Sequence, residues 1–451
     1  MGSAPVTVIG AGLAGSEAAW QLATRGVPVR LIEMRPKVLG PAHRTDRLAE
    51  LVCSNSMKSD DPHTAAGALK HELAALGSLV LACARSASVP AGAALAVDRE
   101  RFADSVTASV SRHPCIDLVR ERANALPRSG HTIVATGPLT DPALEPALSE
   151  VVGPGRLAFF DAAAPVVESA SIDRGRVFAA SRYGKGEGAD YLNCPMDRPT
   201  YERFIDALTA AERVVLKDFE SRDLFHACQP IEEIARRAPD APRFGPMKPV
   251  GLTDPATGER PWAVVQLRAE NREGTAYNLV GFQTNLTFPE QQRVFRMVPG
   301  LEAAEFTRYG VMHRNTFVDA PRVLAPDLSL LARPDVWLAG QLAGTEGYLE
   351  AAATGLLAAL NVCARLTGGS PFVLPRDTLL GSLVSYATDP DTAPYQPMHV
   401  NFGLLPPLPS KMGKRDRYAA YAARAADALD AYVRTRSDLV PAPGATELCA
   451  P

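Results

Sequence analysis

Two cysteines stand among residue types that can activate a thiol for nucleophilic chemistry. Cys53 lies in Leu-Val-Cys-Ser-Asn-Ser-Met-Lys (51–58), among small hydrogen-bonding residues and with a cation nearby. Cys228 lies in His-Ala-Cys-Gln-Pro-Ile-Glu-Glu (226–233), beside a histidine, an amide and two acids. A cation or histidine close to a thiol lowers its pKa and raises the thiolate fraction. We therefore regard Cys53 and Cys228 as candidate reactive cysteines.

A glycine pattern at the start of the chain predicts a dinucleotide site. The apolar run 6–9 leads into Gly-Ala-Gly-Leu-Ala-Gly (10–15), an alanine-rich stretch follows, and a second apolar run, 27–32, ends on Glu33. In this pattern the first glycine permits a tight turn, the second lets the backbone approach a pyrophosphate, and the third lets the helix pack closely on the strand. The helix N-terminus offers unpaired N–H groups and a positive dipole to the phosphates. Glu33 is placed to accept hydrogen bonds from the ribose hydroxyls of an adenosine.

A second glycine segment, 340–347, follows the apolar run 336–339 and precedes another alanine-rich stretch. Alone it is best explained as a tight turn between a strand and a helix. Combined with the N-terminal pattern and the Ala-Thr-Gly strand end at 135–137, it favours a helix N-terminus aimed at the edge of a flavin ring, where reduced flavin carries negative charge. A third cluster, 184–188, has no helix after it and is expected to be a loop. A nicotinamide reductant would therefore bind transiently, without a second site of this type.

The elements that position these residues indicate an α/β fold with an insertion. Alternating strand and helix patterns fill the first part of the chain and return near residue 336, whereas the middle mixes β-prone runs (263–267 and 277–282) with a helical stretch (200–219). A proline-rich turn and a charged helical tail, 411–436, end the chain. We predict a Rossmann-like FAD-binding domain of the glutathione-reductase type, built from residues 1–160 and 325–451. An α+β domain, 161–324, is inserted on the substrate side.

Composition narrows the possible partners and compartments. The 451 residues carry a net charge of −3, so the net charge does not indicate a nucleic-acid partner, although a local basic patch is compatible with this net charge. The apolar run 351–360 is too short for a membrane span and predicts a buried helix. The predicted first strand begins close to the N-terminus, so we expect no room for a signal peptide. Seven scattered cysteines without a Cys-x-x-Cys pair argue against a disulfide framework and a metal site, and favour the cytoplasm. The cysteines expected to be structural are Cys83, Cys115, Cys363 and Cys449, with Cys194 left open but tending the same way.

Six blocks of the sequence form a more specific signature. They are Glu-Met-Arg-Pro (33–36), Leu-Val-Cys-Ser-Asn-Ser (51–56), Tyr-Leu-Asn-Cys-Pro-Met (191–196), Phe-Gly-Pro-Met-Lys-Pro-Val-Gly-Leu (244–252), Arg-Tyr-Gly-Val-Met-His-Arg-Asn-Thr (308–316) and residues 340–355. They resemble the folate- and FAD-dependent tRNA (uracil-5-)-methyltransferase family, TrmFO. The resemblance extends from about residue 5 to about residue 430.

The resemblance implies a flavin-dependent RNA methyltransferase. In this family a methylene group passes from 5,10-methylenetetrahydrofolate, with the help of reduced FAD, to C5 of the tRNA T-loop uridine at position 54, and NAD(P)H is the reductant. Uracil C5 becomes nucleophilic once a thiolate has added to C6. By resemblance Cys228 is that nucleophile, and Cys53 assists at C5 close to the flavin. The family usually has Glu-Gly-Cys-Met around the nucleophile, where this chain has His-Ala-Cys-Gln (226–229).

The glycine patterns and the resemblance together give the candidate binding residues. Those for the cofactor are Gly10, Ala11, Gly12, Leu13, Ala14, Gly15, Glu33, Met34, Arg35, Gly340, Gln341, Glu346 and Gly347. His313 and Tyr348 are candidates for packing against the folate pterin, because a heterocycle stacked on a flavin needs a planar surface on its other side. The candidates for contacting RNA phosphates are Lys411, Lys414 and Arg415, with Arg417, Arg293 and Arg296 as further basic residues. For any single one of these cations, a solvated helix face is the simpler explanation.

Three alternatives remain open at this stage. The same chemistry could act on a ribosomal RNA uridine, because the target is chosen by RNA shape. The related wobble-uridine tRNA-modifying flavoenzyme shares the flavin motifs but carries a long additional C-terminal region, so the block 51–56 and the short C-terminus favour the methyltransferase. The altered frame around Cys228 also allows a folate- and FAD-binding protein without RNA methylation, whereas the retention of both thiols weighs against it.

Overall fold

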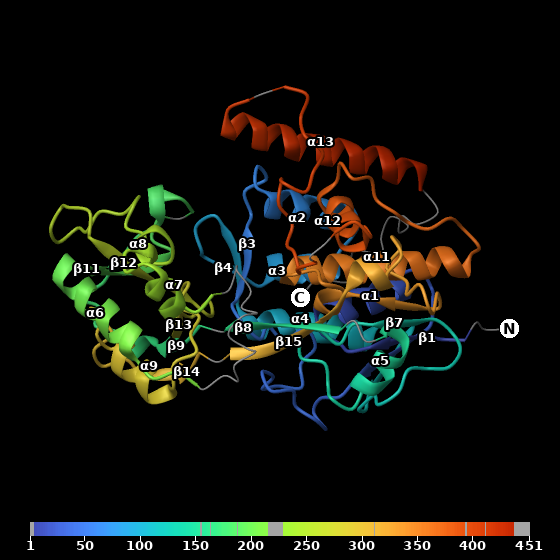
Figure 1. The fold of residues 1–451 in the computed structure, drawn as a ribbon, viewed down its shortest axis with the longest axis horizontal. Coiled ribbons are helices and arrows are strands. Elements are labelled where there is room, and N and C mark those ends of the chain that lie inside the picture. The colour runs from blue at the N-terminus through green and yellow to red at the C-terminus, as the bar shows by residue number, and fades with distance from the viewer. Residues whose placement is uncertain are drawn as a thin grey trace.

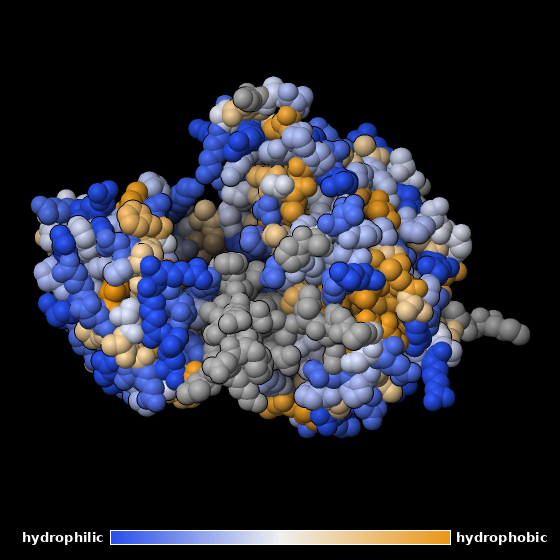
Figure 2. Space-filling view, in the orientation of Figure 1, coloured by the Kyte–Doolittle hydropathy of each residue, from blue (hydrophilic) through white to orange (hydrophobic). Residues whose placement is uncertain are grey.

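The computed structural model describes residues 4–153, 156–162, 164–186, 188–214, 229–310, 312–392, 395–410 and 412–436, with the backbone alone for 156–162 and 312–315. Figure 1 shows two lobes, a larger one that contains the first strands of the chain and a smaller one that contains the strands from β9 (Val166–Glu168) to β14 (Phe306–Arg308). A long helix, α13 (Lys414–Thr435), lies along the outer edge of the larger lobe. In the space-filling view the surface is hollowed between the two lobes on the side of α13 (Figure 2).

The larger lobe is built on a parallel five-stranded sheet in the order β16-β7-β1-β2-β6. Its strands are β1 (Val6–Ile9), β2 (Val29–Glu33), β6 (Ile116–Arg120), β7 (Thr132–Val134) and β16 (Val336–Leu338). β16 pairs with β7 although the whole smaller lobe lies between them in sequence. The runs of Val, Ile and Leu in β1, β7 and β16 are buried on both faces, as expected for a parallel sheet covered by helices, whereas β2 and the edge strand β6 have exposed residues.

Helices and a small sheet complete this lobe. They are α1 (Leu13–Ala23), α2 (Ala65–Ala75), α3 (Leu79–Ser86), α4 (Arg99–Arg112), α5 (Glu145–Val152), α10 (Ala320–Val323), η4 (Gly340–Ala343), α11 (Tyr348–Leu366), α12 (Leu379–Thr388) and the antiparallel sheet of β3 (Ser56–Ser59), β5 (Ala94–Val97) and β4 (Ser88–Val89). α1 packs directly on α11, because Gly355 has no side chain at the crossing: a Cβ there would lie 2.1 Å from the carbonyl oxygen of Ala14.

α11 is a core helix of this lobe. Its 19 residues are long and apolar enough for a membrane span, but 83% of the apolar window is buried inside the fold. Within the described residues the pair α2 and α3 reaches the same length only across a bend of 113°. The expectation of a buried helix over 351–360 is confirmed, and the helix extends further in both directions.

The smaller lobe has its own antiparallel sheet, in the order β10-β11-β12-β13-β9-β14. The elements are β9 (Val166–Glu168), η1 (Ser169–Ser171), β10 (Phe178–Ala179), η2 (Arg182–Gly184), β11 (Tyr191–Met196), α6 (Arg198–Ala210), α7 (Ile231–Arg237), α8 (Ala241–Phe244), β12 (Ala263–Ala269), β13 (Ala276–Leu279), α9 (Phe288–Phe295) and β14 (Phe306–Arg308). Two antiparallel connecting strands, β8 (Arg156–Ala162) and β15 (Met312–Val318), link the lobes.

The predicted α/β fold with a Rossmann-like sheet is confirmed. One buried core joins residues before 153 to residues after 316, and a separate core joins residues between 167 and 304. The domain boundaries at 160 and 324 stay a prediction. The helix expected over 200–219 begins earlier, because Asp197 caps it by accepting from the Thr200 N–H at 2.8 Å, and it ends at Ala210; residues 215–219 lie outside the described residues.

Candidate functional site

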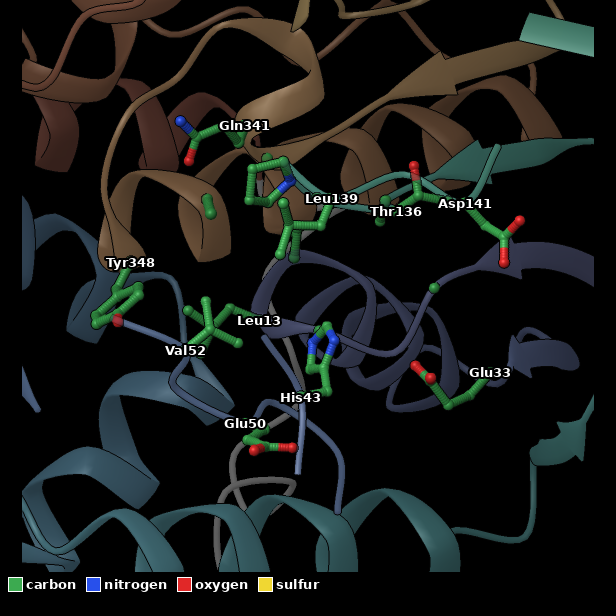
Figure 3. Close-up of a pocket in the computed structure, with 18 of the residues that line it drawn as sticks. Leu13, Glu33, His43, Glu50, Val52, Thr136, Leu139, Asp141, Gln341 and Tyr348 are labelled. Carbon is green, nitrogen blue, oxygen red and sulfur yellow. The ribbon is translucent and has the colours of Figure 1, made fainter. Parts of the chain in front are cut away.

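A cavity of about 420 Å³ opens at the carboxyl ends of β1, β2 and β7. It is elongated: Figure 3 shows Glu33 toward one end and Tyr348 with Val52 toward the other. Its walls include the glycine loop, the loop that carries Cys53, the start of α11 and, from the smaller lobe, Gln283. The carboxyl ends of parallel strands are where open α/β sheets bind their ligands, so the cavity lies where the sequence predicted a cofactor.

The glycine loop leaves room beside its second glycine. A Cβ on Gly12 would have no atom of the described residues within 4 Å, and Gly12 is the N-cap of α1 with no side chain among these residues capping the helix. The other two glycines are needed for packing. A Cβ on Gly10 would lie 2.6 Å from the carbonyl oxygen of Ala135, and one on Gly15 would lie 1.8 Å from that of Gly10. A helix start that is uncapped and open to a cavity is suited to bind an anion.

Glu33 lines the cavity at the end of β2 and is 5% exposed. Its carboxylate accepts hydrogen bonds from the Ala11 N–H at 2.9 Å and from the Arg35 Nε–H at 2.8 Å. Burial alone would raise the pKa of Glu33, but the hydrogen bonds and charge of Arg35 outweigh burial and lower it. Glu33 is therefore an ionised acceptor that also braces the glycine loop, an additional role that its spacing did not reveal.

The second glycine segment forms the opposite wall. Gly340, Gln341, Glu346 and Gly347 all line the cavity, and Gln341 donates a hydrogen bond to Glu346. Gly347 is the N-cap of α11 and adopts a φ of +122°, which disfavours any side chain. The predicted strand–glycine–helix arrangement is present, with a short 3₁₀ helix between the strand and α11.

Cys53 lines the cavity beside Tyr348, which Figure 3 shows at the end opposite Glu33, and Cys53 is partly buried. The N–H of Cys53 donates to the hydroxyl of Tyr348 at 2.9 Å. Burial, followed by the nearby Cys53 side chain, raises the pKa of Tyr348, so this phenol is neutral. Tyr348 and Cys53 thus meet at the start of α11, although 295 residues separate them in sequence.

Several predicted residues fall outside this site or outside the described residues. Cys228 and Lys411 are not among the described residues, and only the backbone of His313, in β15, is described. Lys414 and Arg415 are exposed in the first turn of α13, with the Lys414 Nζ 5.6 Å from the centre of the Tyr418 ring. Two further basic residues bond within the smaller lobe: Arg293 in α9 pairs with Glu290, and Arg296, directly after α9, donates to the carbonyl oxygen of Ala304.

Sequence reasoning missed wall residues that arrive on loops without a recognisable pattern. Glu50 accepts from the Arg35 Nη1–H at 3.2 Å, and Asp141 pairs with Arg122 at 2.6 Å. Figure 3 shows both acids beside the cavity, together with His43. Only the neighbouring strand end 135–137 carried a signal, the Ala-Thr-Gly turn.

The fold and the cavity define a Rossmann-like α/β protein with a ligand site at the carboxyl ends of its parallel strands. Among solved structures, GidA from Aquifex aeolicus matches the chain with a TM-score of 0.70 in one crystal form and 0.69 in another. The match covers 99% of this chain and 77% and 75% of the two GidA chains, at 17% identity, and it shows the shared fold.

Sequence comparisons give the family. The family model described as glucose inhibited division protein A matches residues 5–370. A methylenetetrahydrofolate–tRNA-(uracil-5-)-methyltransferase TrmFO from Geobacter sulfurreducens is 54% identical over 430 residues, 95% of this chain and 99% of the relative. The protein of the same name from Moorella thermoacetica is 55% identical over 410 residues, 91% and 94% of the two chains. The chain belongs to the TrmFO family.

Proposed function

We infer that this protein is an FAD-dependent methylenetetrahydrofolate–tRNA-(uracil-5-)-methyltransferase. The observation that carries this inference is the identity of more than half of the residues to TrmFO proteins over nearly their whole length. The cavity supports it independently, because one continuous space connects the glycine loop to Cys53 and Tyr348. A dinucleotide cofactor and a reactive thiol would then share a single site.

The residues of the cavity fit FAD. The empty space over Gly12 and the uncapped start of α1 suit a pyrophosphate, and the ionised Glu33 suits the adenosine ribose. Gly340, Gln341, Glu346 and Gly347 would surround the flavin end near α11. Bound there, FAD supplies the redox chemistry that converts a methylene group into a methyl group. Met34 and Arg35 would complete the wall beside the adenosine.

We assign the two thiols different roles. Cys228 would attack uracil C6, and Cys53 would act at C5, next to the flavin end of the cavity. The support for Cys228 comes from the family resemblance and from its sequence neighbours. The next residue, Gln229, is buried, and the Ile231 N–H donates to the carbonyl oxygen of Gln283 at 2.7 Å. Gln283 is itself part of the cavity wall, so the chain that follows Cys228 runs close to the site.

The remaining assignments concern the other substrates. We propose that Tyr348 and His313 pack against the folate pterin and that Lys411, Lys414 and Arg415 contact tRNA phosphates. The T-loop uridine is the proposed target, NAD(P)H the transient reductant and the cytoplasm the compartment. Because Glu33 is committed to the FAD ribose in this proposal, it would not select between NADH and NADPH.

The activity is tested by incubating the purified protein with unmodified tRNA, methylenetetrahydrofolate and NAD(P)H, followed by nucleoside mass spectrometry for 5-methyluridine. Cys228→Ala should abolish both methylation and the covalent complex with 5-fluorouridine-containing tRNA on denaturing gels. Cys53→Ala should stop turnover yet still trap this RNA. Cys115→Ala, at a partly buried thiol outside the cavity, is the control and should behave as wild type. Normal methylation by both Cys228→Ala and Cys53→Ala would refute these roles.

The reductant is tested separately by rapid mixing under anaerobic conditions. NADH or NADPH should bleach the oxidised flavin band of the wild-type protein. If neither does so, the nicotinamide assignment is wrong, while the methyl transfer could still be measured with chemically reduced flavin.

A further inference from the structure

The loop that carries Cys53 is held by side chains from both lobes. The carbonyl oxygens of residues 51 and 53 both accept hydrogen bonds from the guanidinium of Arg99 on α4, the second at 2.8 Å. The carbonyl oxygen of Val52 accepts from Arg308 on β14 of the smaller lobe. With the N–H of Cys53 bonded to Tyr348, three consecutive residues are fixed through their backbone.

Arg99 is itself anchored across the two lobes. Its Nε–H donates to the carboxylate of Glu270, which follows β12, and the two side chains are 17% and 10% exposed. Burial alone would lower the pKa of Arg99, but the charge of Glu270 outweighs it and raises the pKa. One charged guanidinium therefore connects the smaller lobe to the carbonyl oxygens on either side of Val52.

Asn55 reinforces this connection two residues further on. Its side chain donates to the carbonyl oxygen of Ala269 at 2.9 Å and accepts from the Arg268 Nε–H at 2.8 Å. Both partners belong to β12, immediately before Glu270. The position of β12 and the position of the Cys53 loop are thus mechanically coupled.

Several ionisable groups among the described residues lie close to the Cys53 loop. The guanidiniums of Arg99 on α4 and Arg308 on β14 both interact electrostatically with Cys53, Glu270 after β12 pairs with Arg99, and the phenol of Tyr348 on α11 is neutral. Further along the same stretch of chain, Lys58 pairs with Glu350. The Lys58–Glu350 pair, at 2.7 Å, balances its own charge. Within the described residues, the two guanidiniums of Arg99 and Arg308 against the one carboxylate of Glu270 leave the surroundings of Cys53 positive, and a positive environment favours a thiolate.

We propose that Arg99, anchored by Glu270, is a positioning residue for Cys53: it holds the backbone of the Cys53 loop in place from the smaller lobe and, with Arg308, stabilises the thiolate. This inference rests on the proposed function, which gives Cys53 a chemical role. Arg99 acts through the loop and does not itself have to touch a substrate.

The test is alkylation of the FAD-bound protein by iodoacetamide at a series of pH values. Cleavage by trypsin after Arg47 and Lys58 places Cys53 alone on peptide 48–58, so mass spectrometry reads its rate directly. Peptide 113–120, with Cys115, is the internal reference. In Arg99→Gln the pH midpoint for Cys53 should rise by about one unit, with alkylation about tenfold slower near neutral pH. The Cys115 rate should not change.

Arg101→Gln is a matched control on the same helix. Arg101 also bridges the lobes, through Glu273 at 2.9 Å, but neither of its ion pairs involves the Cys53 loop. It should leave the Cys53 midpoint at the wild-type value. An unchanged Cys53 midpoint in Arg99→Gln would overturn the proposal. Equal shifts in Arg99→Gln and Arg101→Gln would also overturn it, because the loss of any contact between the lobes would then explain the shift.

A second variant keeps the test decisive if Arg99→Gln does not fold. In Arg99→Lys a single ammonium cannot bond two carbonyl oxygens and Glu270 with the geometry of a guanidinium. Alkylation of Cys53 should then be several-fold slower near neutral pH, and a wild-type rate would overturn the proposal. Alkylation of Cys53 does not require methyl transfer. If the wild-type protein failed to methylate tRNA, the proposed function would be refuted, whereas the alkylation rates would still test the role of Arg99.

Discussion

Helix starts in the core and at the cavity are satisfied in different ways. In the core, the first N–H groups of α3 donate to the buried carboxylate of Glu17, with the Val80 N–H at 2.9 Å. Those of α12 donate to Glu72, with the Leu380 N–H also at 2.9 Å. At the cavity, α1 begins at Gly12 with no side-chain cap and open space beyond.

The difference shows what the fold reserves for a ligand. A helix start leaves N–H groups without partners inside the helix, and burying such groups costs free energy unless an acceptor is supplied. α3 and α12 receive their acceptor from a neighbouring helix of the same chain. α1 does not, so the anionic acceptor at its start is expected to come from the cofactor.

The largest effect is expected when the open helix start is filled. Gly12→Val should fold, because the backbone at Gly12 is not in the left-handed region and its Cβ would meet no atom in the part of the chain that the structure describes, but the side chain would project into the cavity. We expect the flavin absorbance of the purified protein to be lost. Gly369→Val, at an exposed glycine outside the cavity, is the control. Full flavin content in Gly12→Val would contradict the assignment of α1.

A smaller but still large effect is expected when a core cap is removed. Glu17 accepts hydrogen bonds from Ser78 at 2.8 Å as well as from the start of α3. Glu17→Ala leaves these buried donors unpaired and should destabilise the protein by about 3 kcal/mol. Urea denaturation measures this decrease in the free energy of unfolding. Glu121→Ala, which breaks an exposed ion pair with Arg30, should cost less than about 1 kcal/mol. Equal losses would show that Glu17 is not a structural cap.

The cap of α12 should also make stability depend on pH. Burial raises the pKa of Glu72 to about 8 from an ordinary value of 4.5. Because the folded state holds this proton more tightly than the unfolded state, the stabilisation is complete below the ordinary pKa and is lost as the pH rises toward 8. The melting temperature should fall over this window, and it should fall less in Glu72→Gln. Parallel curves for the two proteins would contradict the raised pKa.

The sequence was informative where chemistry depends on neighbours in the chain. Residues of the glycine pattern, Glu33 and both ends of the segment 340–347 line the cavity, because a strand, a turn and a helix are local structures. The contacts that hold Cys53 and cap α12 could not be read in this way. Glu72 and Leu379 are 307 residues apart, and Arg99 meets Glu270 only through the docking of the two lobes. No local periodicity encodes such pairs, so they emerged only from the tertiary structure.

The smallest effect is expected at α13, whose start combines an absent cap with cations. Gly413 provides no side-chain cap, and Lys414 lies exposed in the first turn, where a positive charge opposes the helix dipole. A contact with an RNA phosphate would explain why a cation occupies this unfavourable position. Lys414→Gln should therefore leave the melting temperature unchanged or slightly higher, yet weaken tRNA binding a few-fold. The slope of log K against log salt concentration should decrease in magnitude by about 0.9 for one lost phosphate contact.

Arg434→Gln, at the other end of the same helix, is the control. The exposed cation of Arg434 interacts favourably with the helix dipole, and its loss should not change the salt dependence of tRNA binding. Filter binding of unmodified tRNA at several salt concentrations decides the matter, and equal slopes for Lys414→Gln and wild type would leave Lys414 as a solvated surface residue.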